Sequence, residues 1–342
     1  MGKVLCESTQ VQSPITHPLH WRSPGHNLKL EDPDHIIESA CVASASWENV
    51  HGLDEQQRRA LQRLQTNGVL WKNSEKNPNG VGRSVVFQLH HGGEVSSDGN
   101  CLFTACQKAI GCADARDLRR RAVRRFLEDY ESACENEQEH INGAIRHMYF
   151  PDLSVGWGIH LVQEMKLLAS KDSRGSLYTA IDELVSIGMQ RQNAAESIYK
   201  ERCIPVNDAK SWAKFMSISG STDDGHDIIT LHYTEEGLLS VDENPHGLAA
   251  AFGDDLAIEC LATEFHREIY VVQAHGVDAM VEEENCAFFL PHRPRREVRE
   301  VPFFLLMKGT GWCGAGGDHY EPLIARPCAP PSDEMAAAVI GE

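Results

Sequence analysis

Residues 97–106 read Ser-Asp-Gly-Asn-Cys-Leu-Phe-Thr-Ala-Cys and follow a short β-prone run at residues 84–90. Four apolar residues beyond the turn recur at the spacing of one helix face: Leu102, Phe103, Cys106 and Ile110. Asp, Gly and Asn are typical turn residues, so the pattern predicts a helix that begins at or next to Cys101. Asn100, or Asp98 two residues earlier, is placed to cap this helix.

A cysteine in the first turn of a helix is well placed for nucleophilic catalysis. The backbone N–H groups and the positive end of the helix dipole stabilise a thiolate. The same N–H groups can bind the oxyanion that forms when a thiolate attacks a carbonyl. The alternative is that Cys101 packs as a small hydrophobic residue, as free cysteines usually do, in a chain that has 11 cysteines.

A nucleophilic cysteine needs a histidine base, which can lie far away in the sequence. His319 follows a glycine-rich loop and begins a short apolar strand, after the strand-like run at residues 301–307. Glu321, two positions on, lies on the same side of an extended strand. It is placed to hold the imidazole in one tautomer, as the third member of a triad does. The alternative for His319 is an ordinary surface or loop histidine, which is expected for most of the 17 histidines.

Three motifs together resemble the ovarian-tumour (OTU) family of deubiquitinating cysteine proteases. The first is Asp98-Gly99-Asn100-Cys101-Leu102-Phe103, and the last is His319-Tyr320 followed by an acid. Between them, residues 252–262 read Phe-Gly-Asp-Asp-Leu-Ala-Ile-Glu-Cys-Leu-Ala and lead into Ile-Tyr-Val-Val at residues 269–272. This segment resembles the family's Trp-Gly-Gly-x-x-Glu-Leu-x-Ala-Leu-Ala helix and the strand after it. Three motifs in the family's order are much more specific than any one of them.

The resemblance implies a papain-type α/β (α+β) fold with a small central sheet sandwiched by helices, which the irregular alternation of helices and strands also favours. It implies hydrolysis of the isopeptide bond between the C-terminal glycine of ubiquitin and a lysine, without a cofactor. Cys101 would be the nucleophile and His319 the base. Backbone N–H groups of Cys101 and of the loop around Asp98 would form the oxyanion hole. Glu321 stands where the family usually has Asp or Asn. The implied partners are ubiquitin, polyubiquitin chains and ubiquitinated proteins.

Other interpretations of the same residues remain open at this point. One is a non-catalytic ubiquitin-binding module with the same fold. Another is a cysteine hydrolase that acts on a ubiquitin-like modifier or on a polyprotein. His90 and His91 could be read as a metal site, but the sequence offers no further ligands at usable spacing, so a packed or solvated pair is expected.

The two ends of the chain are interpreted from composition, whereas the OTU-like catalytic domain and an insertion within it are what the resemblance implies. Residues 1–45 are expected to form a flexible or wrapping arm, residues 46–326 the catalytic domain, and residues 327–342 a frayed tail. Residues 136–245 are predicted to be an inserted, mostly helical lobe that helps to hold ubiquitin. Its predicted helices lie at residues 160–168, 177–200, 209–216 and 228–239.

A long helix is predicted to follow Asp114, with five arginines on its outer face. These outward arginines are either a solvated helix surface or a contact for a partner. They are Arg119, Arg120, Arg121, Arg124 and Arg125.

Composition limits the remaining function classes. The chain of 342 residues is 42% hydrophobic and 24% charged, which is typical of globular proteins. Lys and Arg number 32 against 50 Asp and Glu, and the net charge of −18 argues against a nucleic-acid partner. The cysteines include no C-x-x-C pair, so reduced thiols in the cytoplasm are expected, or in a host cytosol if a pathogen delivers the protein. No apolar run approaches the length of a membrane span.

Overall fold

The computed structural model describes the chain in seven stretches: residues 47–73, 83–111, 114–154, 162–275, 287–308, 319–328 and 338–340. The predicted N-terminal arm and the glycine-rich loop before His319 lie outside these stretches. Among the helices described, none combines the length and the apolar character needed to cross a membrane.

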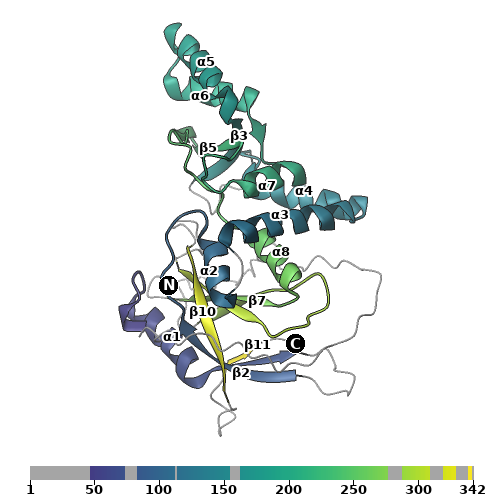
Figure 1. The fold of residues 1–342 in the computed structure, drawn as a ribbon. Coiled ribbons are helices and arrows are strands. Elements are labelled where there is room, and N and C mark those ends of the chain that lie inside the picture. The colour runs from purple at the N-terminus through teal and green to yellow at the C-terminus, as the bar shows by residue number, and fades with distance from the viewer. Residues whose placement is uncertain are drawn as a thin grey trace, which may run out of the picture.

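A seven-stranded sheet with the order β11-β1-β2-β10-β9-β7-β8 forms the centre of the protein (Figure 1). Its strands are β1 Val69–Asn73, β2 Arg83–His91, β7 Ile269–Ala274, β8 Ala287–His292, β9 Phe303–Lys308, β10 His319–Cys328 and β11 Ala338–Ile340. Neighbouring strands are antiparallel except for the parallel pairs β1 with β11 and β7 with β9. β10 pairs with β2 on one side and with β9 on the other, so His319 begins a strand near the middle of the sheet.

Helices cover both faces of this sheet. On one face lie η1 Trp47–Asn49 and α1 Glu55–Asn67; on the other lie α2 Cys101–Ile110, α3 Ala115–Glu131 and α8 Asp255–Phe265. Strand residues alternate between the two cores, as the two-residue period of a strand requires. In β9, for example, Leu305 belongs to the α2–α3–α8 core and Phe304 to the α1 core. The expected mixed α/β fold is confirmed.

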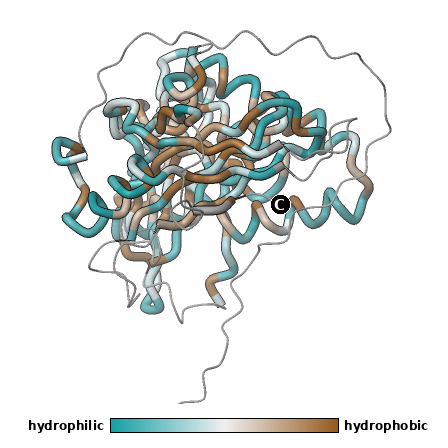
Figure 2. Tube along the Cα trace, turned by 90° about the horizontal axis from the view of Figure 1, so that it is seen from below, coloured by the Kyte–Doolittle hydropathy of each residue, from teal (hydrophilic) through white to brown (hydrophobic). Residues whose placement is uncertain are grey.

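The inserted segment carries a second, smaller sheet, which lies at the top of Figure 1. Its four strands have the order β4-β3-β5-β6, and α5 and α6 pack on them to form a separate hydrophobic core. The elements are β3 Gln163–Ser170, η2 Lys171–Ser173, α5 Arg174–Ser186, α6 Arg191–Arg202, β4 Ile204–Pro205, β5 His226–Thr234 and β6 Gly237–Asp242. Figure 2 shows hydrophobic residues gathered in inner strands and hydrophilic residues along many outer segments.

The prediction of a mostly helical lobe is wrong in two places. Residues 163–170 form β3 rather than part of a helix, and residues 228–239 lie in the β5–β6 hairpin. Short apolar runs do not distinguish a buried strand from a buried helix, and here the pairing of β3 with β5 decides the outcome. The predicted helix at residues 177–200 is two helices, interrupted near Gly188, whose φ of 102° favours glycine.

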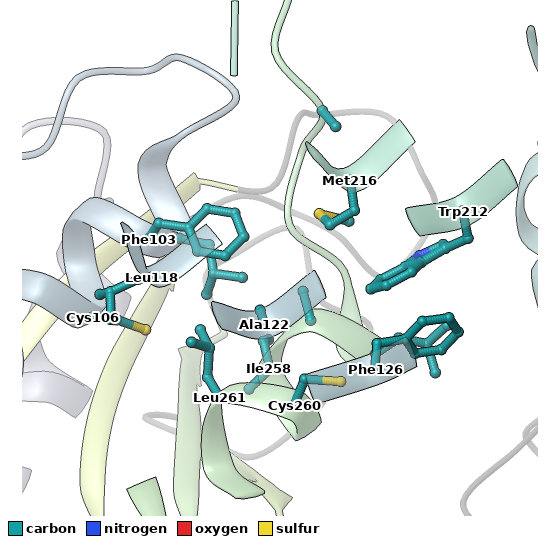
Figure 3. Packing of buried hydrophobic residues seen from close by; sticks show 14 of the residues in the cluster. Phe103, Cys106, Leu118, Ala122, Phe126, Trp212, Met216, Ile258, Cys260 and Leu261 are labelled. Atoms are coloured by element: carbon teal, nitrogen blue, oxygen red, sulfur yellow. The ribbon is translucent and has the colours of Figure 1, made fainter. Parts of the chain in front are cut away.

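Two helices of the inserted segment lie outside the second core. α4 Glu135–Tyr149 and α7 Ala209–Ser217 contribute to the main core instead. Figure 3 shows Trp212 of α7 next to Phe126 of α3, and the centroids of their rings are 4.1 Å apart. The helix predicted at residues 209–216 is therefore confirmed, but it is part of the main domain.

The tail and the arginine-rich helix also differ from expectation. Residues 338–340 of the predicted frayed tail form β11 and pair with β1. In α3, Arg120 is mostly exposed, as predicted, but Arg121 and Arg125 pair with Glu264 of α8 at 3.0 Å. Arg119 is fully buried. A guanidinium can turn inward when carbonyls or carboxylates are there to accept its hydrogen bonds, which periodicity alone does not reveal.

Candidate active site

The helix α2 begins at Cys101, as predicted, and the Cys101 side chain is buried with 1% exposure. The expected side-chain cap is absent from this helix, although Asn100 occupies the capping position. The Asn100 amide instead donates to the carbonyl of Ser219 at 3.0 Å and accepts from Arg119 at 3.0 Å. The Asp98 carboxylate accepts from the Asn100 backbone N–H at 2.8 Å. The loop before Cys101 is thus held by neighbouring segments rather than by a helix cap.

The fold brings Cys101 to the beginning of β10, the strand that starts at His319. α2 packs against β10 (Figure 1). Burial raises the pKa of the Cys101 thiol, and hydrogen bonding from the backbones of Tyr320 and Leu102 offsets this only in part. Tyr320 directly follows His319, so the thiol lies beside the histidine segment. In this conformation the sulfur is a neutral thiol at pH 7, because the net pKa shift is upward.

The two ring nitrogens of His319 have different surroundings. Nε2 is 3.5 Å from the carboxylate of Glu321, as expected for residues on the same side of one strand. Nδ1 is buried and has no hydrogen-bond partner among the described residues. An imidazole with one nitrogen facing an acid and the other unpaired has the arrangement that a general base requires.

Glu321 has two shorter contacts than the one with His319. Its carboxylate is 2.7 Å from Nζ of Lys308 and 2.7 Å from Nε2 of His91, and all three side chains are buried. Burial raises the pKa of Glu321, but the hydrogen bonds from His91 and Lys308 outweigh it, so the net pKa is lowered. Glu321 is therefore an ionised carboxylate, and His319 shares it with two other groups.

Sequence reasoning did not identify the roles of His91 and Lys308. His91 is packed, as was expected of the His90–His91 pair, with its ring 5.6 Å from that of Trp47. One feature of the sequence could have pointed to Lys308: it is the one charged residue in the otherwise apolar strand Phe303–Lys308. Lys308 is paired with His319 in the register of β9 and β10. From there its side chain reaches the carboxylate of Glu321, two residues along β10.

No group of three or more His, Cys, Asp or Glu residues suited to a metal ion occurs within the described stretches.

Both predicted oxyanion donors are occupied in this conformation. The N–H of Cys101 donates to the carbonyl of Asp98 at 3.1 Å, and the N–H of Asp98 donates to the carbonyl of Ser96 at 2.9 Å. An oxyanion hole needs these N–H groups to point at the reacting carbonyl. The loop must therefore change its hydrogen bonding before these groups can stabilise an oxyanion.

Gly99 allows the loop to pass close to the chain segment before α8. A Cβ atom at this position would lie 2.4 Å from the carbonyl oxygen of Ala250. We expect Gly99→Ala to displace the loop and to lower the free energy of unfolding by about 1–3 kcal/mol, as overpacked sites do. Urea denaturation measures the change. Gly143→Ala in α4 is the control, because among the described residues no atom beyond the adjacent backbone of its own helix lies within 4 Å of the new Cβ. Equal stability of the two variants would contradict the prediction.

Comparison with known proteins found no relative of this chain. No family model, no curated protein and no solved structure matches the chain. The residues that the fold brings together are therefore the basis for an argument about function. They define a candidate cysteine nucleophile on a helix that packs against the strand carrying a histidine and an ionised carboxylate.

Proposed function

We propose that this protein is a cysteine-type deubiquitinase of the OTU kind. It would hydrolyse the isopeptide bond between the C-terminal glycine of ubiquitin and a lysine of the modified protein. One observation carries the proposal: Cys101 at the start of α2 lies against the start of β10, which carries His319 and Glu321. The motifs around these residues, which resemble those of the OTU family in sequence and in order, give the reaction its substrate class.

The first half of the reaction forms a thioester. The Cys101 sulfur attacks the glycine carbonyl of ubiquitin while its proton passes to His319, whose Nδ1 has no hydrogen-bond partner within the described stretches. The carbonyl oxygen becomes an oxyanion, bound by the N–H groups of the nucleophile loop. The intermediate then collapses, the C–N bond breaks, and the lysine amine leaves with the proton from the imidazolium.

The second half releases ubiquitin. His319 takes a proton from water, and the resulting hydroxide attacks the thioester carbonyl. Breaking the C–S bond returns the proton to sulfur and frees the ubiquitin carboxylate. Glu321 supports both halves, because an ionised carboxylate 3.5 Å from Nε2 stabilises the imidazolium in each.

In this proposal the site becomes active only when substrate binds. The loop before Cys101 is closed, in the sense that its N–H groups bond to its own carbonyls, and the thiol is protonated. Cys101 is buried, and its pKa is raised by that burial. Both oxyanion donors are bonded to carbonyls of their own loop. In this proposal the ubiquitin C-terminal tail opens the loop as it binds, which couples activity to recognition of the correct substrate. The protein would act in a reducing compartment, since the reaction needs a free thiol, and Cys101 is free.

The same closed loop favours a second candidate, a non-catalytic ubiquitin-binding module. A buried thiol with a raised pKa is a poor nucleophile. The position of His319 favours catalysis instead, because it begins the strand that lies against Cys101 and its Nε2 is 3.5 Å from the carboxylate of Glu321. A third candidate, a hydrolase for a ubiquitin-like modifier, would use the same residues with another substrate.

The proposal is tested with ubiquitin that carries a thiol-reactive group at its C-terminus. We expect the wild-type protein to gain the mass of one ubiquitin and Cys101→Ala to gain none. Peptide mapping should place the adduct on Cys101 and not on Cys134, which is exposed and serves as an internal reference. No adduct on a folded wild-type protein would reject the deubiquitinase. A panel of ubiquitin-like modifiers with the same reactive group would then separate the other two candidates.

A further inference from the structure

Arg119 of α3 is a buried cation whose described hydrogen bonds go to uncharged groups. It is 1% exposed. Its guanidinium donates to the carbonyls of Gly99 at 2.7 Å, Met216 at 2.8 Å and Ala251 at 2.8 Å. A further bond reaches the side-chain oxygen of Asn100 at 3.0 Å. The guanidinium carbon also lies 4.3 Å from the centre of the Phe103 ring.

Burying such a cation costs desolvation free energy. Arg119 is therefore expected to make an interaction that an apolar residue could not make. Burial lowers the pKa of Arg119 to about 10, although carboxylates including Asp224 and Asp98 oppose the shift. Arg119 therefore keeps its charge at pH 7. An apolar side chain would fill the same space, but it could not bind carbonyls of three separate segments, which the fork of guanidinium N–H groups can do.

The three segments meet at the nucleophile. Gly99 and Asn100 directly precede Cys101, Met216 lies at the end of α7 in the inserted segment, and Ala251 precedes α8. Phe103 of α2 and Met216 of α7 belong to the same hydrophobic core, which Figure 3 shows.

A second link joins the same parts of the molecule. The side chain of Asn100 donates to the carbonyl of Ser219, and Ser219 forms a β-bridge with Ala250. Gly99 is in close contact with Ala250. The inserted segment is thus attached to the loop that carries the nucleophile.

We propose that Arg119 is a positioning residue for Cys101, and that Met216 at the end of α7 and Ser219 in the segment after it take part in this positioning. The inference rests on the proposed function for its reaction and on the contacts above for its geometry. Arg119 is buried, so it does not touch ubiquitin. It fixes the direction in which the loop presents Cys101 to the substrate carbonyl.

Kinetics separates positioning from a general structural role. We expect Arg119→Met to lower kcat by about 100-fold, the usual effect of a nucleophile misplaced by an ångström. The substrate is a ubiquitin with a fluorogenic C-terminal amide. KM should change little, because no substrate contact is removed. Arg119→Lys should recover part of kcat, since an ammonium can still bond to one or two of the carbonyls. Arg120→Met, on the exposed face of the same helix, should behave as wild type.

A measurement without ubiquitin tests the geometry independently. In Arg119→Met we expect amide hydrogen exchange in residues 96–101 to be about tenfold faster, the effect of losing one charge-assisted hydrogen bond. Exchange in β9 should stay unchanged. If Arg119→Met does not fold, Asn100→Ala takes its place, with a smaller effect in the same direction on kcat and on exchange.

The outcomes are distinguishable. An unchanged kcat in a folded variant, or a loss that appears wholly in KM, overturns the proposal. If the wild-type protein does not cleave ubiquitin, the proposed function fails, and the positioning role of Arg119 is then judged by hydrogen exchange alone. Faster exchange in Arg119→Met that is confined to residues 96–101 supports this role, and unchanged exchange refutes it.

Discussion

Cys101→Ala and His319→Ala are each expected to lower the turnover of a ubiquitin substrate by a factor of roughly 10⁴ or more. In the proposed mechanism Cys101 provides the attacking sulfur and His319 carries its proton, so neither half of the reaction can proceed without both. The two residues act as one unit. The double variant should therefore be no slower than either single variant. Steady-state kinetics with a fluorogenic ubiquitin amide measures the loss.

Two controls make this prediction specific. Cys134→Ala removes an exposed thiol away from the site and should keep full activity. Each inactive variant should also retain the urea midpoint of the wild-type protein to within the experimental error, since the measurement concerns chemistry. Substantial turnover by folded Cys101→Ala would show that another residue is the nucleophile and would end the proposal.

Glu321→Ala is expected to have the largest effect on stability. The substitution leaves the ammonium of Lys308 buried without its carboxylate partner and removes the acceptor of His91. Breaking a buried pair by removing one partner costs about 3–5 kcal/mol. Urea denaturation should show this loss, whereas Glu139→Ala, which removes a mostly exposed carboxylate, should be close to neutral. A loss for Glu321→Ala no greater than that for Glu139→Ala would contradict the network.

The Glu321 contribution should also depend on pH. The pKa of Glu321 is lowered in the folded protein from its ordinary value of 4.5. Its stabilising effect is therefore present above the pKa of the unfolded chain and is lost as the pH falls through the folded pKa. The stability difference between wild type and Glu321→Gln should shrink on acidification. A difference that stays constant through the acid range would mean that ionisation of Glu321 does not matter.

The expected role of Glu321, which was to orient His319, is incomplete because the carboxylate also binds two other side chains. The carboxylate makes its shorter contacts with His91 and Lys308. Glu321→Ala is then expected to lose activity through both a less stable fold and a less stable imidazolium. Glu321→Gln, which keeps the shape and can still accept a hydrogen bond from Lys308, is the better variant for measuring the effect on the imidazolium alone.

The local parts of the site follow from sequence because their causes are local. A turn of Asp, Gly and Asn before an apolar helical period places Cys101 at the first position of α2. The acid two residues after His319 shares its face of β10 because strand side chains alternate. Neither feature requires knowledge of what packs against it.

Other features depend on contacts between distant segments, which no local period reveals. The charge of Arg119 predicts an outward side chain, yet the carbonyls of Gly99, Met216 and Ala251 turn it inward. The apolar runs of β3 and β5 are compatible with helix or strand until they pair with each other.

The state of the site was likewise decided by the tertiary structure. Burial keeps Cys101 protonated. The turn that closes on Asp98 occupies the oxyanion donors, and strand register brings Lys308 to Glu321. The sequence by itself determined which residues are candidates for the proposed chemistry, because residue types and local turns are encoded in short stretches of chain. The tertiary structure alone decided how these groups are held, because hydrogen bonds and burial depend on which segments meet.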